Sequence, residues 1–227
     1  MKYKKQIWFT LSAWPVPVSI AGEVNTLADG IRIDTDIDCY CESITKWTAS
    51  VNMRWKDLPN WLPFLNSTTG LPDLDSMPIN NNQGVGVQDG ITDIERQTVM
   101  NMWSMSSSPL WIGGDITNMD ITAYQILTNT DILAVNQIGS LPKLVTNDPN
   151  TPVYSKSLND GKLAVAVFNL GSNPMTFSIK FQDLELKGRQ QMYDLVSHSE
   201  LGVFTDEWVV EGLPSHGSRL ITLQQAS

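Results

Sequence analysis

Carboxylates gather at two places in this chain where they could support acid–base chemistry. The denser group is Asp34-Thr35-Asp36-Ile37-Asp38, and Asp73 and Asp75 form a second pair. Residues two apart on an extended strand point to the same side, so the acids of one group repel each other, which raises a carboxyl pKa. A raised pKa is what a general acid needs near neutral pH. A solvated turn or a calcium-like acidic loop is the alternative interpretation of the first group.

Other catalytic chemistries have little support in the sequence. Asp115 follows Gly113 and Gly114, and because Gly-Gly-Asp is ordinary turn chemistry we favour a turn role for it. Of the two histidines, His198 and His216, the second is expected in a turn and not as a catalytic base. The sequence contains no serine nucleophile elbow, phosphate loop or dinucleotide fingerprint. If the protein is an enzyme it works with carboxylates, which favours a glycosidase over a protease or kinase.

Strand and helix patterns alternate in the region that carries these acids. Apolar runs and short alternating segments predict strands at Ile7–Leu11, 30–34, 72–79 and Pro109–Ile112, the first and last being buried runs. Apolar spacing and a capping box predict helices at 19–28, 42–55, from Thr92 with Glu95 onward, and at 120–128. Such alternation predicts a parallel sheet, with functional side chains at the C-terminal ends of its strands. Periodicity alone does not choose between half of an eight-stranded barrel and a small open sheet.

The pattern changes near residue 140. Short alternating runs are then separated by Gly, Asn, Asp and Pro, and the clearest strand is Leu163–Asn169. Further strands are expected at 175–181, 191–195, 207–210 and 218–223. This pattern is typical of an antiparallel sandwich. We therefore predict an α/β plus all-β chain, with an α/β domain over 1–138 and an antiparallel β domain over 139–227.

Composition narrows the range of partners. The 227 residues are 41% hydrophobic and 17% charged, and the net charge is −9. So acidic a surface, without clustered Lys and Arg, argues against a nucleic-acid partner. Since no stretch of about 18 apolar residues occurs, no membrane span is expected. Eight Trp residues mildly favour a sugar ligand, with core packing as the alternative.

The two cysteines, Cys39 and Cys41, are separated by one residue. Thiols that close rarely reach disulfide geometry with each other. No second Cys or His pair lies at zinc-ligand spacing. We therefore expect no metal site, and either reduced thiols or a partner cysteine elsewhere.

Several segments, read in order, resemble those of the family 27 glycoside hydrolases, the α-galactosidases and their relatives. They are Arg32–Asp38, Asp73-Leu74-Asp75 with Leu where the family has Pro, Gly90–Gln97, Ser108–Asp115 and Ile126–Gln137. Their order and spacing hold from about residue 7 to residue 137. The motifs Ser-Ala-Trp-Pro and Asp-Thr-Asp-Ile-Asp-Cys-Tyr-Cys are most similar to those of the fungal members of the family.

This resemblance implies a (β/α)8 TIM barrel followed by an antiparallel β-sandwich domain. Residues 1–138 would be strands five to eight of the barrel, and 139–227 the C-terminal domain. The resemblance also implies a secreted protein, galactosides as substrates, and no cofactor.

The resemblance also carries site residues over to this sequence. The family is retaining, and Asp36 matches its general acid/base. Arg32 and Asp75 match residues that contact the sugar. Ser12 and Trp14 lie where family members contact or shape the galactose pocket. The resemblance leaves α-galactose, α-N-acetylgalactosamine and β-L-arabinopyranose open as the sugar.

One expected catalytic group has no counterpart. The family nucleophile is an Asp at the end of the fourth strand, and Met1–Gln6, which precede the first strand here, contain no Asp. Retaining hydrolysis needs two carboxyl groups about 5–5.5 Å apart. We therefore expect this chain alone to be inactive, as a fragment that needs a missing N-terminal half. A non-catalytic carbohydrate-binding pseudoenzyme, or half of a split enzyme, is the alternative.

Overall fold

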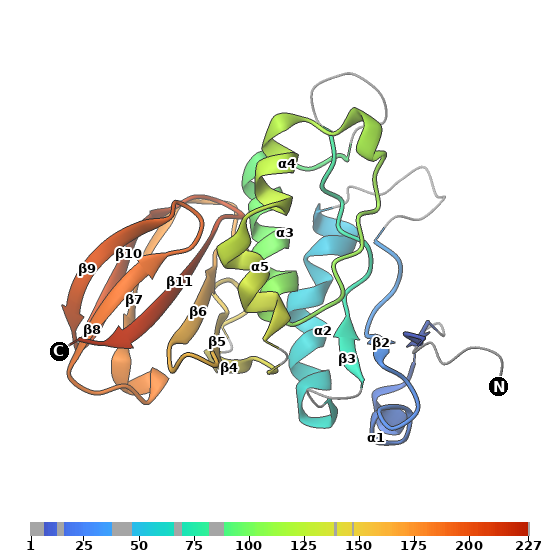
Figure 1. Ribbon diagram of the computed structural model, residues 1–227, viewed down its shortest axis with the longest axis horizontal. Helices are drawn as coiled ribbons and strands as arrows, with labels where there is room; N and C mark the ends of the chain where they lie inside the picture. The colour runs from blue at the N-terminus through green and yellow to red at the C-terminus, as the bar shows by residue number, and fades with distance from the viewer. Residues whose placement is uncertain are drawn as a thin grey trace.

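The computed structural model describes residues 7–12, 16–37, 47–65, 70–81, 89–138, 140–146 and 148–226. Figure 1 shows short strands and helices from the first part of the chain beside a layered β-structure formed by the later residues. Within the described ranges, no helix is long and apolar enough to cross a membrane.

The strands of the first region form a small parallel sheet. They are β1 (Thr10–Leu11), β2 (Gly30–Arg32) and β3 (Leu71–Asp73), in the order β1-β2-β3. Both pairs are parallel, and a further parallel bridge joins Met77 to Ile112. The parallel sheet in chain order confirms what the strand–helix alternation predicts.

Helices alternate with these strands and follow them in the chain. They are α1 (Ala21–Val24), α2 (Met53–Trp61), α3 (Asp93–Met105), α4 (Ile121–Leu127) and α5 (Thr130–Gln137), with shorter turns η1 (Val18–Ile20), η2 (Trp47–Val51), η3 (Leu62–Phe64) and η4 (Ile116–Asn118). The capping box before α3 is confirmed, because Glu95 N donates to Thr92 Oγ1 at 3.3 Å and Thr92 N donates to Glu95 Oε2 at 2.7 Å. Helix α5 was not predicted. Its cap is Asn129, whose side chain accepts the N–H groups of Asp131 and Ile132.

The first apolar run was predicted to be buried on both faces, and this prediction is wrong. Ile7, Trp8 and Phe9 are 81%, 47% and 52% exposed, and only Thr10–Leu11 form the strand. In the described part of the chain β1 pairs with β2 alone. A run of this kind is buried on both faces only when other elements cover it, and here nothing described covers its outer side.

The run Pro109–Ile112, at the other end of the sheet, was also predicted to be a buried strand and is also partly exposed. Trp111 and Ile112 are about half exposed. This segment makes a single bridge with Met77 in place of the predicted strand. Both ends of the sheet therefore expose large apolar side chains.

The later residues form two antiparallel layers. One sheet has the order β4-β5-β6-β11-β8-β9, and the other is the pair β10-β7. The strands are β4 (Lys143–Thr146), β5 (Val153–Ser157), β6 (Leu163–Phe168), β7 (Met175–Lys180), β8 (Arg189–Asp194), β9 (Ser199–Thr205), β10 (Glu207–Leu213) and β11 (Ser218–Gln225), with the turn η5 (Phe181–Leu184) after β7. All pairs are antiparallel, which confirms the predicted sandwich. Strands β4, β5 and β9 were not predicted.

Strand β6 lies at the centre of both cores. Ala164, Ala166 and Phe168 join the apolar core that includes α3 and α5, while Val165 and Val167 join the core beneath β7 and β10. Side chains alternate between the two faces of a strand, so a strand covered on both faces is apolar throughout. Each large aliphatic side chain buried this way contributes about 1.5–3 kcal/mol. The first core thus continues from the helices into the sandwich, and the boundary at residue 138 stays a prediction.

Candidate active site

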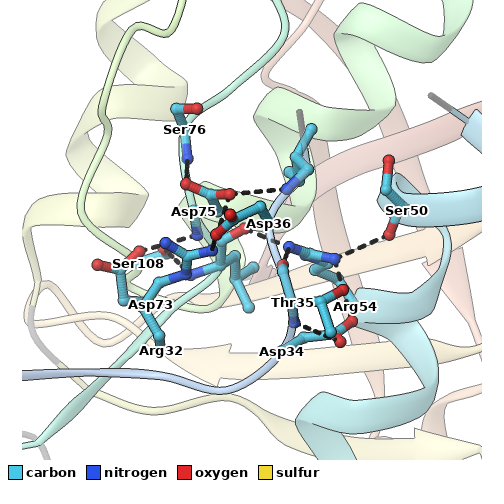
Figure 2. Close-up of polar contacts among 12 residues, drawn as sticks. Arg32, Asp34, Thr35, Asp36, Ser50, Arg54, Asp73, Asp75, Ser76 and Ser108 are labelled. Atoms are coloured by element: carbon cyan, nitrogen blue, oxygen red, sulfur yellow. Dashed lines mark hydrogen bonds and ion pairs between the residues drawn. The ribbon is translucent and has the colours of Figure 1, made fainter. Parts of the chain in front are cut away.

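The candidate site lies where two neighbouring parallel strands end. Arg32 is the last residue of β2, Asp73 is the last residue of β3, and the two are partners in the strand register. Asp36 and Asp75 follow in the connecting segments. Because parallel strands end at the same edge of a sheet, these side chains come together (Figure 2).

Arg32 joins the two acids that the family resemblance singles out. Its Nη2 lies 2.8 Å from Asp36 Oδ1 and 2.9 Å from Asp75 Oδ2. The side chain of Asp36 is 56% exposed, whereas those of Arg32 and Asp75 are mostly buried. The structure therefore brings three of the predicted site residues together and leaves the proposed proton donor open to solvent.

Asp75 is held in an unusual backbone conformation. Its φ angle is 75°, in the left-handed region that non-glycine residues rarely occupy. Asp75 N donates to Asp73 Oδ1 at 2.8 Å, and Trp103 Nε1 donates to Asp75 O at 2.7 Å. Its carboxylate accepts the N–H of Ser76 at Oδ1 and that of Ile37 at Oδ2, both at 2.7 Å. The second bond ties the Asp75 side chain to the segment that carries Asp36.

The acids of the first group do not point the same way, which corrects the expectation from strand geometry. Strand β2 ends at Arg32, so the two-residue alternation of a strand no longer applies to the residues after it. Asp34 turns inward, where its Oδ2 lies 3.0 Å from Arg54 Nη1, while Asp36 is exposed beside Arg32. The third acid, Asp38, lies outside the described residues.

Burial raises the pKa of two carboxyls around this site. For Asp73 burial is the main cause, opposed by the N–H of Asp75 and the charge of Arg32. For Asp57, on α2, burial and then a hydrogen bond to Asp34 raise the pKa to about 6. Removal from water penalises the charged form. Burial is thus the first cause in both cases, ahead of the repulsion that the sequence pattern suggested.

The remaining predicted residues have different outcomes. Ser12 follows β1 and is exposed; its contact with a sugar stays a prediction. Trp14 lies outside the described residues, as do Cys39 and Cys41. Asp115 caps η4 by accepting from Thr117 N at 2.9 Å, which confirms its turn role.

One residue of the site was not found from the sequence. Arg54, on α2, is fully buried and contacts the segments that precede both Asp36 and Asp75. A signal was present, because Arg54 falls in line with Trp47, Val51 and Leu58 at helical spacing. An arginine among apolar positions of one helix face implies a buried charge with partners.

Comparisons with known proteins show what this chain is similar to. Residues 148–223 match a family model described as the alpha galactosidase C-terminal beta sandwich domain. A probable alpha-galactosidase of Dictyostelium discoideum is 28% identical over 78% of this chain and 51% of its own length. An alpha-galactosidase of Cyamopsis tetragonoloba is 26% identical over 80% of this chain and 47% of its own. The chain thus spans about half the length of the curated relatives that it matches.

A solved structure shares the fold over nearly the whole chain. It is a GH27 β-L-arabinopyranosidase from Geobacillus stearothermophilus, with a TM-score of 0.85 at 24% identity, covering 96% of this chain and 49% of that one. The fold is accordingly the C-terminal part of a TIM barrel followed by a β-sandwich. With its matched sandwich domain and its α-galactosidase relatives, the chain is similar to the C-terminal region of family 27 glycoside hydrolases of the α-galactosidase type.

Proposed function

We propose that the protein to which this chain corresponds is a retaining glycoside hydrolase that releases terminal α-linked galactose. This chain would supply the proton-donor side of its active site. The observation that carries the proposal is the single Arg32 nitrogen that contacts both Asp36 and Asp75 at the ends of adjacent parallel strands. Relatives named α-galactosidase support the choice of substrate class.

In this proposal Asp36 acts twice. It first gives its proton to the glycosidic oxygen as the bond to the sugar breaks, and a second carboxylate forms the covalent glycosyl–enzyme intermediate. Asp36 then takes a proton from water as the water attacks that intermediate. The high exposure of its side chain suits a group that must meet both a leaving group and water.

Arg32 and Asp75 would bind the sugar. The guanidinium donates and the carboxylate accepts hydrogen bonds, which together can hold neighbouring hydroxyl groups. We do not assign the nucleophile to Asp75. Both of its oxygens already accept backbone N–H groups, from Ser76 and Ile37, and its side chain is mostly buried. The nucleophile would come from a part of the barrel that this chain does not contain.

A second candidate is a non-catalytic sugar-binding protein built from this chain alone. The exposure of Ile7, Trp8 and Phe9 beside β1 favours a larger barrel, since an open strand edge with apolar side chains tends to pair with further strands. A missing N-terminal half is the partner that we propose, either fused or separately encoded. Secretion, a galactoside ligand and the absence of nucleic-acid or membrane partners are parts of the same proposal.

Hydrolysis of a chromogenic α-galactoside tests the proposal. The chain alone is compared with the chain extended by the sequence that precedes it in the genome. We expect activity only in the extended protein, and we expect Asp36→Asn to remove most of it. Asp160→Asn, a change of an exposed acid in the sandwich, is the control and should keep full activity.

Two results would contradict this reading. Near-normal activity of Asp36→Asn in the extended protein would exclude Asp36 as the proton donor. An active isolated chain would mean that Asp34, Asp73 or Asp75 acts as the nucleophile. An extended protein that cleaves an α-N-acetylgalactosaminide or a β-L-arabinopyranoside instead would change the sugar and keep the mechanism.

A further inference from the structure

We propose that Arg54 is a positioning residue, which sets the placement of Asp36 relative to Asp75 by holding the backbone in front of each. The inference rests on the proposed function in assigning roles to the two acids. The contacts on which it depends are independent of those roles. Arg54 itself would touch neither substrate nor reacting atoms.

The guanidinium of Arg54 is fully buried and bonded on several sides. Nε donates to Leu74 O at 3.2 Å, and Nη2 donates to Thr35 O. Nη1 donates to Ser50 O at 2.9 Å and to Asp34 Oδ2 at 3.0 Å. These bonds use four of the five N–H groups of the side chain. One planar group thereby connects three separate chain segments.

The two backbone carbonyls that Arg54 reaches outside its own helix region occupy equivalent places in the chain. The carbonyl of Thr35 belongs to the peptide unit that enters Asp36, and the carbonyl of Leu74 belongs to the one that enters Asp75. Peptide units are planar, so fixing a carbonyl also fixes the N–H and the Cα of the next residue. Arg54 therefore holds the backbone of both acids at once.

The second arginine acts on the side chains of the same two acids. Arg32 Nη2 contacts the carboxylates of Asp36 and Asp75, and Figure 2 shows Arg32 and Arg54 approaching this loop from different sides. Arg54 thus holds the backbone of the two acids, and Arg32 holds their carboxylates. Sub-ångström placement of this kind decides how well a proton donor works.

The strained conformation of Asp75 adds to the need for such a clamp. A non-glycine residue at φ 75° persists only where surrounding bonds define its conformation. The bond from Arg54 to Leu74 O lies immediately before this residue. Without it, the backbone of Asp75 would be free to relax away from Ile37 and Arg32.

The cost of burying Arg54 supports a specific role. Burial lowers its pKa, while the charges of Asp34 and Asp75 oppose that shift. Val51 and Leu58, on the same helix face, are apolar and fully buried, and apolar replacements of buried ion pairs are often neutral or stabilising. A charged group in this position is better explained by the geometry that it imposes than by stability.

Two N–H groups report directly on the proposed geometry. Ile37 N donates to Asp75 Oδ2, and Trp103 Nε1 donates to Asp75 O. Hydrogen exchange at these groups, followed by NMR on the full chain, measures how well the two segments stay together. In Arg54→Lys, which keeps the charge and loses the fork of donors, we expect both to exchange at least about tenfold faster. Amides of β6 should keep their protection.

A second buried arginine provides the matched control. Arg96, on α3, is also fully buried and forms ion pairs with Asp89, Asp93 and Asp120. Arg96→Lys should leave the exchange of Ile37 and Trp103 within about twofold of wild type. If Arg54→Lys unfolds the chain, Asp34→Asn is the second variant, because it weakens one anchor of Arg54 and keeps its bonds to Leu74 O and Thr35 O. It should accelerate exchange at the same two groups by a smaller factor.

The outcomes separate this inference from the proposed function. Unchanged exchange at Ile37 and Trp103 in a folded Arg54→Lys or Asp34→Asn chain would overturn the positioning role, whatever the activity. So would an equal acceleration in Arg96→Lys. In an extended protein that hydrolyses the galactoside, Arg54→Lys should lower kcat/KM roughly tenfold to hundredfold, and Arg96→Lys should not. An inactive extended wild type would remove the proposed function and leave the exchange result standing.

Discussion

Arg32 Nη2 lies within 2.9 Å of one carboxylate oxygen of Asp36 and one of Asp75. A single nitrogen atom thus joins two acids that are 39 residues apart in the sequence. Without this cation the two negative charges would face each other in a half-buried space, where repulsion is poorly screened. Arg32, Asp36 and Asp75 therefore form a three-residue charge cluster, in which the arginine cation stabilises both carboxylates.

The first prediction concerns this charge cluster. Arg32→Gln removes the cation and leaves the two carboxylates to repel each other, so galactose should bind at least about tenfold more weakly, in line with the loss of a charge-assisted hydrogen bond. Isothermal titration of galactose into the extended protein measures it. Arg219→Gln, which removes a half-exposed arginine on β11, should bind galactose as wild type does. Equal affinity of both variants would exclude Arg32 from sugar binding.

The second prediction concerns a buried lysine. Lys156 Nζ lies among Val135 O, Ser104 O and Ser107 Oγ, and burial lowers its pKa to about 7. Between this value and the ordinary value of 10.5, the unfolded chain carries the proton and the folded chain does not. The free energy of unfolding therefore rises with pH across that window.

Replacement of the lysine tests this directly. In Lys156→Met the rise of the free energy of unfolding between pH 7 and pH 9 should be smaller than in wild type. Urea denaturation at several pH values measures it. Lys162→Met, at a partly exposed lysine, should keep the wild-type slope. An unchanged slope in Lys156→Met would show that another group titrates in this range.

The third prediction concerns Asp57. Its folded-state pKa, about 6, lies above the ordinary value of 3.8, so between these values the folded chain binds more protons than the unfolded chain. Its contribution to stability is therefore present at low pH and is lost as pH rises through 6. Asp57→Asn should raise the melting temperature at pH 7 relative to wild type, and the gain should shrink toward pH 4. Thermal unfolding followed by circular dichroism measures it, and a gain that grows at low pH would contradict the assignment.

The fourth prediction concerns the open edge at β1. Trp8 and Phe9 are about half exposed beside a strand that is paired on one side within the described residues. Charged residues on an edge suppress edge-to-edge association. Trp8→Lys with Phe9→Lys should reduce self-association of the isolated chain in sedimentation velocity, whereas Val203→Lys on β9 should not. If both variants associate equally, the β1 edge is not the surface involved.

The local features of the fold are readable in the sequence. The capping box at Thr92 and Glu95 was predicted because its partners are three residues apart. The core strand β6 was predicted because the run from Leu163 onward is the clearest strand pattern of the second region. Segments that resemble a known family identified Arg32, Asp36 and Asp75. Their proximity follows from the chain order, because consecutive parallel strands lie side by side and end at the same edge of the sheet.

Other features depend on which segments meet in space. The same kind of apolar run is buried in β6 and exposed at Ile7–Phe9, because burial is set by neighbours that a local pattern does not contain. The side chains of Asp34 and Asp36 point to different sides because strand β2 ends at Arg32. Beyond that residue, a spacing of two no longer predicts on which side a side chain lies.

The sequence was sufficient to predict the parallel sheet, the antiparallel sandwich and the acidic residues that follow the strands. The bonds from Arg54 to the backbone in front of two of these acids became visible in the folded chain. The acceptors of Arg54, Asp34, Thr35, Ser50 and Leu74, come from three segments spread over 41 residues. A buried charge finds its partners through the packing of those segments, and no short-range spacing in the sequence encodes that contact.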